Sequence, residues 1–253
     1  MDDLKWCINY LKEYNKINSI ISKTDFNTFR GLMNITLPLS LSDEYYLRQD
    51  KVIKEELSKR KIIDVNELIY KNNIALYKGD ITSLKADAIV NACNEKLLGC
   101  FYPLHNCIDN MIHSYSGLQV RNDLYKIMKE QNKDEENGKC KVTKGYNLFS
   151  KYIFHTVGPK VIENVTKQDE IDLKNCYLSC LTKANKMNLN SIVFPCISTG
   201  IYNFDQSTAC DIAFKTVSTF LKENNSKIKV IFNVFKDTDY YLYKEKIGDL
   251  NDY

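Results

Sequence analysis

Residues 74–94 read IALYKGDITSLKADAIVNACN and contain two short apolar runs, at 74–77 and 88–90. Short, nearly continuous apolar runs are typical of strands buried on both faces of a parallel sheet. Three more candidate strands follow at residues 152–157, 192–194 and 227–235.

Two segments between the later strands place apolar residues at i, i+3, i+4 and i+7, which predicts amphipathic helices at 173–184 and 209–221. Strands that alternate with such helices predict an α/β sandwich with a buried, largely parallel sheet. In these folds ligands bind beyond the carboxyl ends of the strands. Residues 133–141, KDEENGKCK, are expected to form a charged loop.

Residues 1–70 follow a different pattern and predict a small helical extension. Helices are expected near residues 8–14, over 42–57 and from residue 64. Gly31 and Pro38 are expected to act as breakers between the first two. This extension either has no chemistry of its own or covers one lip of the ligand site.

The composition excludes several classes of protein. The 253 residues carry a formal net charge of +3, with 44% hydrophobic and 26% charged residues, which is ordinary for a globular chain. The charge does not argue for nucleic-acid binding, and no apolar run is long enough for a membrane span. Nine cysteines, an odd number, with no secretory signal argue against a disulfide framework and predict the cytoplasm.

Residues 91–113, NACNEKLLGCFYPLHNCIDNMIH, contain a candidate metal site at Cys100, His105 and Cys107. Thiolates together with an imidazole suit Zn²⁺. Three protein ligands would leave one coordination position open to water or substrate. The alternative is that both cysteines are core thiols and the histidine belongs to the loop, and the spacing alone does not decide between these interpretations.

Asp109 and His113 are four residues apart, so they share one face of a helix that begins near Cys107. Asp109 could orient or deprotonate a water molecule. The commoner role for an Asp at such a place is to cap the helix. Asn91 and Asn94 flank a strand end, where amides can bind sugar hydroxyls, although the turn interpretation is favoured from sequence alone.

Residues 195–204, PCISTGIYNF, supply small residues and closely spaced backbone N–H groups before a helix expected near Asp205. This arrangement can cradle a phosphate. The pattern is weak by itself, because many turns between strand and helix contain Ser, Thr and Gly. It is not a Walker loop, since it lacks the lysine of that motif.

Together these segments resemble the macrodomain family, which binds ADP-ribose, and in particular its zinc-containing branch. The resemblance covers roughly residues 70–250, and FRGLMNITLP in the extension is also like the zinc branch. It rests on five segments in order: LYKGDITSLKADAIVNACN, LLGCFYPLHNCIDNMIHSYSG, GYNLFSKYIFHTVGP, PCISTGIYNF and VIFNVFKD.

The resemblance implies a fold, with a mixed, largely parallel central sheet in a three-layer α/β/α macrodomain over residues 71–253 and a helical extension over 1–70. It also implies an activity, the zinc-dependent removal of a single ADP-ribose from a modified protein. A reader module that only binds ADP-ribose, and an O-acetyl-ADP-ribose deacetylase, are the alternatives. A sirtuin-type ADP-ribosyltransferase system is the implied partner, and the chain is expected to be a monomer.

The resemblance also assigns roles to individual residues. Asp80 would accept a hydrogen bond from the adenine amino group beside Ile81, and Phe235 would stack on the base. Asn94 and Asp109 would be catalytic, with Asn94 holding the distal ribose next to one zinc ion. The remaining ADP-ribose contacts would come from Cys107, Ile108, Ser198, Thr199, Gly200, Ile201 and Tyr202, and the zinc ligands would be Cys100, His105 and Cys107.

Overall fold

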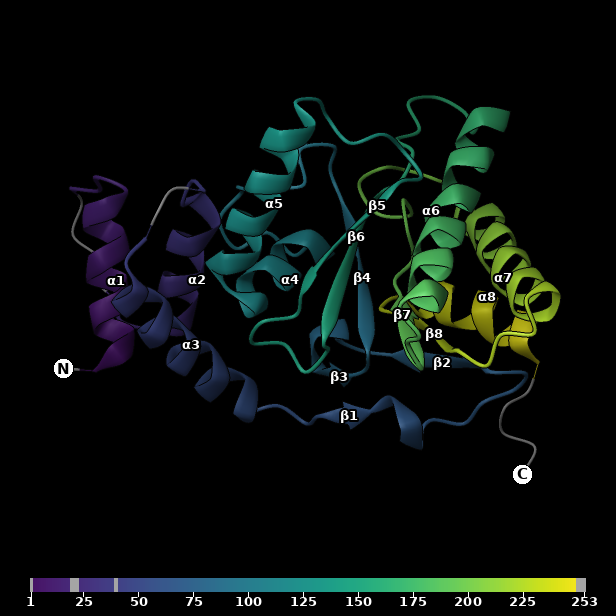
Figure 1. Ribbon diagram of the computed structural model, residues 1–253, viewed down its shortest axis with the longest axis horizontal. Coiled ribbons are helices and arrows are strands. Elements are labelled where there is room, and N and C mark those ends of the chain that lie inside the picture. Colours follow the sequence, from purple (N-terminus) through teal and green to yellow (C-terminus); the bar gives the residue numbers. More distant parts are fainter. Residues whose placement is uncertain (1, 19–22, 39–40, 249–253) are drawn as a thin grey trace.

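The computed structural model describes residues 2–18, 23–38 and 41–248. Its main sheet has six strands in the order β2-β8-β7-β4-β6-β5 (Figure 1). All neighbouring strands are parallel except β5, which pairs antiparallel with β6. The strand bounds are β2 Ile74–Lys78, β4 Ala88–Cys93, β5 Cys140–Lys144, β6 Tyr152–Val157, β7 Ser191–Phe194 and β8 Lys229–Val234. A separate two-stranded pair joins β1 (Ile63–Asp64) to β3 (Leu84–Lys85).

Helices cover both faces of the main sheet, as the sequence predicts. One face packs against α6 (Lys167–Lys186), α7 (Gln206–Glu223) and α8 (Asp237–Ile247). The other face packs against α4 (Ile108–Ser116) and α5 (Leu118–Gln131). Beyond α4 and α5 lie the N-terminal helices α1 (Asp3–Tyr14), α2 (Phe26–Ile35) and α3 (Asp43–Ser58) (Figure 1). Within the described residues no helix combines the length and the hydrophobicity needed to cross a bilayer.

Three local expectations are wrong. Residues around Gly31 form helix α2, because Asp25 caps its start and the apolar face of the helix is buried. The helix expected from residue 64 is a single 3₁₀ turn, Val65–Glu67. The charged loop of residues 133–141 ends at Cys140, where the edge strand β5 begins.

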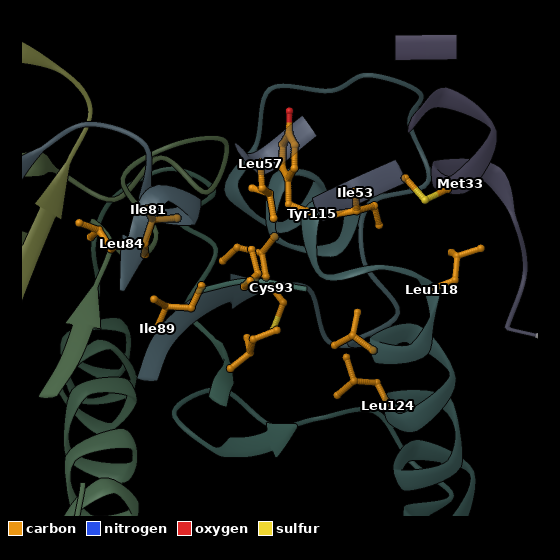
Figure 2. Packing of buried hydrophobic residues seen from close by; sticks show 14 of the residues in the cluster. Met33, Ile53, Leu57, Ile81, Leu84, Ile89, Cys93, Tyr115, Leu118 and Leu124 are labelled. Carbon is orange, nitrogen blue, oxygen red and sulfur yellow. The ribbon is translucent and has the colours of Figure 1, made fainter. Parts of the chain in front are cut away.

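The N-terminal helices do not have a core of their own. Met33 of α2 and Ile53 and Leu57 of α3 belong to the same buried cluster as Ile89 of β4 and Leu124 of α5 (Figure 2). A boundary at residue 70 remains a prediction from the sequence. The burial shows that apolar side chains from both sides of that boundary stabilise one core.

A buried arginine fixes the end of α2. Arg121 of α5 is 2% exposed, and its guanidinium donates to the backbone carbonyl groups of Met33, Asn34 and Thr36. The last carbonyls of a helix have no partner within the helix and carry partial negative charge. Arg121 therefore satisfies them and joins α2 to α5.

We predict that Arg121→Met lowers the free energy of unfolding by about 3–5 kcal/mol, because it leaves buried carbonyl groups without a donor. Equilibrium urea denaturation measures this loss. Arg48→Met is the matched control, because Arg48 lies in a more exposed ion pair with Asp3, where a loss within about 1 kcal/mol is expected. Equal losses in the two variants would contradict the assigned role.

Candidate functional site

A cavity of about 830 Å³ opens at the carboxyl ends of the parallel strands, where ligands bind in such folds. Its volume is within the range of small-molecule sites. The fourteen residues to which the resemblance assigns ADP-ribose, catalytic or zinc roles all line it: Asp80, Ile81, Asn94, Cys100, His105, Cys107, Ile108, Asp109, Ser198, Thr199, Gly200, Ile201, Tyr202 and Phe235. The structure therefore brings together residues that come from four separate segments of the chain.

The ligand atoms of Cys100, His105 and Cys107 lie within 4.8 Å of one another. Among the described residues no other group of three or more Cys, His, Asp or Glu side chains is arranged in this way. The Cys100 Sγ atom is 3.5 Å from His105 Nδ1, and tetrahedral Zn²⁺ with ordinary bond lengths requires about 3.6 Å between such atoms. The donor set and its spacing therefore fit Zn²⁺.

Burial raises the pKa of the Cys107 thiol to about 12, and the nearby Asp109 carboxyl adds to the rise. A thiol in such surroundings stays protonated unless a cation compensates the thiolate charge. The electrostatics of the loop are thus consistent with a thiolate that forms when a metal binds.

Helix α2 holds the loop that carries these ligands. Arg30 is 7% exposed, and its guanidinium donates to the backbone carbonyl of His105 at 2.9 Å. Asn34, one turn further along α2, accepts from the backbone N–H of Leu104 at 3.0 Å. Both bonds go to the backbone of the loop, so they fix its path without using the ligand atoms.

Asn110 of α4 holds the same loop from the other side. Its side-chain amide donates to the carbonyl groups of Cys100 and Tyr102, while its Oδ1 accepts from Arg30 at 2.8 Å. The side chain is fully buried. The loop is therefore held between α2 and α4 at several successive backbone positions.

Asp109 does not cap helix α4, so that interpretation from the sequence is wrong. The cap is Cys107, whose Sγ accepts from the backbone N–H of Asn110. Asp109 lies in the first turn, 5% exposed, and its Oδ1 accepts from the Asn91 side chain at 2.8 Å. Among the described residues, its hydrogen bond and its close approach to His113 both involve Oδ1, which leaves Oδ2 available to a water or ligand in the cavity.

Burial raises the pKa of Asp109 to about 6, against the opposing effects of Asn91 and Arg121. His113 Nε2 lies 3.5 Å from Asp109 Oδ1. Burial, with the nearby positive charge of Arg121, lowers the pKa of His113 well below its usual value, so the ring is neutral. Asp109 is thus a carboxyl group whose pKa lies near neutrality, next to an uncharged imidazole.

The two asparagines at the end of β4 differ in their surroundings. Asn91 is fully buried within the strand and contacts Asp109 and His155, so the turn interpretation is wrong for it. Asn94 does stabilise the following turn, since its amide donates to the Gly99 carbonyl and its Oδ1 accepts from the Lys96 N–H. Asn94 also lines the cavity.

Two residues of the loop after β7 adopt the left-handed backbone region. Ser198 and Asn203 have positive φ angles of 66° and 55°, and Asn is among the residues that tolerate this region. A Cβ on Gly158 would lie 2.1 Å from Ser198 Oγ, so only glycine fits beside this loop. At Gly200 an added Cβ meets no atom within 4 Å, so protein packing does not require glycine there.

Asp80 and Phe235 lie at the remaining part of the cavity wall. Phe235 is 79% exposed, which leaves its ring free to stack on a ligand. Asp80 Oδ1 accepts from the backbone N–H and the hydroxyl of Thr82. Asp80 Oδ2 lies 2.6 Å from the guanidinium of Arg60, a residue that follows α3.

The sequence did not single out Arg30, Asn34 or Arg60. The first two are polar residues at i and i+4 in the otherwise apolar segment FRGLMNI, a pattern that indicates a polar contact made by a buried helix face. Arg60 has no such signal, because it lies among exposed charged residues in SKRK.

This chain is similar to known proteins in both sequence and structure. The model of the family described as Macro domain matches residues 90–213. The chain is 45% identical over 250 residues to a protein-ADP-ribose hydrolase of Staphylococcus aureus (strain COL), covering 96% of this chain and 94% of the relative. It is similar in structure to a Trypanosoma brucei macrodomain in complex with ADP-ribose, with TM-score 0.67, 28% identity, and coverage of 86% and 95% of the two chains. It is also similar to an Oceanobacillus iheyensis macrodomain with ADP, with TM-score 0.63, 32% identity, and coverage of 69% and 89%.

We predict that Asp109→Asn raises the free energy of unfolding at pH 8. Because the folded pKa of about 6 lies above the unfolded value near 3.9, ionisation of Asp109 favours the unfolded state as pH rises. The gain is therefore absent near pH 4, grows up to about pH 6, and reaches about 1–3 kcal/mol above it.

Urea denaturation at pH 4 and pH 8, with a zinc chelator present so that no bound cation alters the local charge, measures this difference. If Asp109→Asn and the native protein have the same free energy of unfolding at both pH values, the raised pKa of Asp109 is contradicted.

Proposed function

Because this chain belongs to the macrodomain family, we propose that it is a protein-ADP-ribose hydrolase, which removes mono-ADP-ribose from modified proteins. The observation that carries the proposal is the position of Asp109. A buried carboxyl group with a pKa near 6 lines the same cavity as the candidate metal ligands and the phosphate loop. Groups whose pKa lies near the working pH are the efficient general bases.

In this proposal the cavity binds ADP-ribose along its length. Asp80 accepts from the adenine amino group beside Ile81, and Phe235 stacks on the base. Backbone N–H groups of the loop after β7 bind the pyrophosphate. Asn94 and the Cys107–Asp109 segment surround the distal ribose, so the scissile linkage lies at the end of the cavity next to Asp109.

Cys100, His105 and Cys107 would hold one Zn²⁺ in the proposed enzyme, and the separation of their ligand atoms fits this ion. Bound Zn²⁺ acts as a Lewis acid toward an oxygen in its open position. The backbone contacts of Arg30, Asn34 and Asn110 keep the three ligands close together.

Asp109 orients the attacking water and accepts its proton. Its Oδ1 is held by Asn91, so the carboxylate keeps one orientation while Oδ2 contacts the water. The His113 ring behind it is neutral. It therefore does not form a full ion pair with the carboxylate, which stays available to the water. A fixed carboxylate that has lost most of its contact with bulk water is the arrangement expected of a general base.

Two alternatives share this cavity. A reader module would need ADP-ribose binding but no carboxylate at the reacting end, and the burial of Asp109 against Asn91 rather than at a helix cap favours the enzyme. Deacetylation of O-acetyl-ADP-ribose would use nearly the same residues, so substrate tests have to separate it. A sirtuin-type transferase partner, a cytoplasmic location and a monomeric state remain predictions from the sequence.

We predict that the native protein releases ADP-ribose from a mono-ADP-ribosylated protein and that a strong zinc chelator stops the release. His105→Ala and Cys107→Ala should bind less than one zinc ion per chain and lose release in parallel. Cys140→Ala is the control, since Cys140 is a partly exposed thiol in β5 outside the cavity.

Release measured by chromatography and zinc measured by elemental analysis distinguish the outcomes. Full release in the presence of chelator would remove the metal from the mechanism but keep the hydrolase. Calorimetric binding of ADP-ribose without release from any linkage would favour the reader module instead.

We predict that Asp109→Ala reduces release by at least about a hundredfold and leaves the affinity for ADP-ribose within a few-fold of the native value. The physical reason is that the substitution removes the proton acceptor but none of the residues that contact the base or the pyrophosphate. Single-turnover release and isothermal calorimetry measure the two effects separately. An alanine variant that hydrolyses at the native rate would show that Asp109 is not the base.

A further inference from the structure

Arg60 connects the N-terminal helices to the wall of the cavity. It follows the last turn of α3, where its backbone N–H donates to the Leu57 carbonyl at 3.0 Å. Its guanidinium Nη1 donates to Asp80 Oδ2 at 2.6 Å and to Thr82 Oγ1 at 2.9 Å. Arg60 does not line the cavity, whereas Asp80 does.

The face of the same guanidinium stacks on an aromatic ring. Arg60 Cζ lies 3.9 Å from the centroid of the Tyr115 ring in α4. Leu57 and Tyr115 belong to one buried cluster (Figure 2). The guanidinium is therefore fixed in its plane by Tyr115 and along its edge by Asp80 and Thr82, an arrangement that suits arginine and not lysine.

These contacts occupy most of the hydrogen-bond acceptor positions of the Asp80 carboxylate. A carboxylate has about four acceptor positions. Thr82 uses two of them on Oδ1, through its backbone N–H and its hydroxyl, and Arg60 uses one on Oδ2. One acceptor position on Oδ2 remains for a ligand, and it can accept only from a hydrogen-bond donor.

We propose that Arg60 is a positioning residue that fixes Asp80 so that the cavity selects a purine with an amino group at position 6. This inference rests on the proposed function, which places adenine at Asp80. A purine with a 6-oxo group presents an acceptor to a carboxylate that is held in place, so it is rejected. The helical extension thus determines base selectivity although none of its residues needs to touch the base.

The test compares the affinities of ADP-ribose and inosine diphosphate ribose, which differ at position 6 of the purine. The native protein should bind ADP-ribose at least about tenfold more tightly, because a wrongly paired polar group costs that much or more. Arg60→Met should weaken ADP-ribose binding about tenfold and reduce the preference to within about threefold. Arg60→Lys should lie between the two, since it keeps the charge but not the planar contacts.

Arg48→Met is the matched control. Arg48 lies in α3, the helix that precedes Arg60, pairs with Asp3 and Glu44, and stacks over the Trp6 ring, away from the cavity. It should keep the native preference. If Arg60→Met weakens both ligands equally, or retains the native preference, the proposal is wrong. Should Arg60→Met fail to fold, the same criterion applied to Arg60→Lys decides.

A double-mutant cycle with Asp80→Ala separates this proposal from the proposed function. When Asp80 is absent, Arg60→Met should have no further effect on the preference, because Arg60 acts through that carboxylate. An additive effect would contradict the proposal. A native protein that releases ADP-ribose while Arg60→Met keeps full selectivity overturns only this inference, whereas absence of ADP-ribose binding by the native protein overturns the proposed function itself.

Discussion

The burial of the Arg121 charge at the carbonyl end of α2 is the constraint on which the ligand site depends. A buried guanidinium is costly unless its donors are hydrogen-bonded. Here Nη1 donates to three backbone carbonyls of one helix end, while Nε has no hydrogen-bond partner among the described residues. Any shift of α2 would break these bonds. The face of the same guanidinium lies 4.5 Å from the ring of Phe101, which belongs to the loop between the candidate metal ligands. One charge thus fixes both α2 and the loop that α2 holds.

This constraint explains how an irregular loop can keep three ligand atoms together. The loop has no regular secondary structure of its own between Cys100 and Cys107. Its backbone is instead bound by side chains of α2 and α4, most directly by Arg30 and Asn110. Because such loops lose conformational entropy when they bind a metal or substrate, holding the backbone beforehand lowers that cost. The N-terminal helices therefore contribute to the site by ordering the backbone of this loop and not by supplying metal ligands.

The sequence predicts well what is formed locally and poorly what is formed between distant segments. The sheet, the flanking helices and the loops at the strand ends follow from hydrophobic periodicity, and the resemblance to a known family placed all fourteen candidate residues around one cavity. Helix α2 was not predicted, because Gly31 suggested a break while the burial of the helix decided otherwise. The pairing of Arg60 with Asp80 joins residues twenty positions apart through tertiary packing, and no local pattern encodes it.

The polar groups beneath the reacting end of the cavity are arranged at a cost in stability. Asp109 is buried with a raised pKa. Among the residues that the structure describes, both ring nitrogens of His113 and Asn91 Oδ1 have no hydrogen-bond partner. Elsewhere buried polar groups are usually paired, because an unpaired one is destabilising. Such departures concentrate where a protein needs reactive groups. The rest of the fold offsets this loss of stability. Strand β4 holds Asn91, and helix α2 holds the loop through Arg30 and Asn34. The same rigidity keeps the Asp109 carboxyl group in one orientation through its bond to Asn91, as the proposed general base requires.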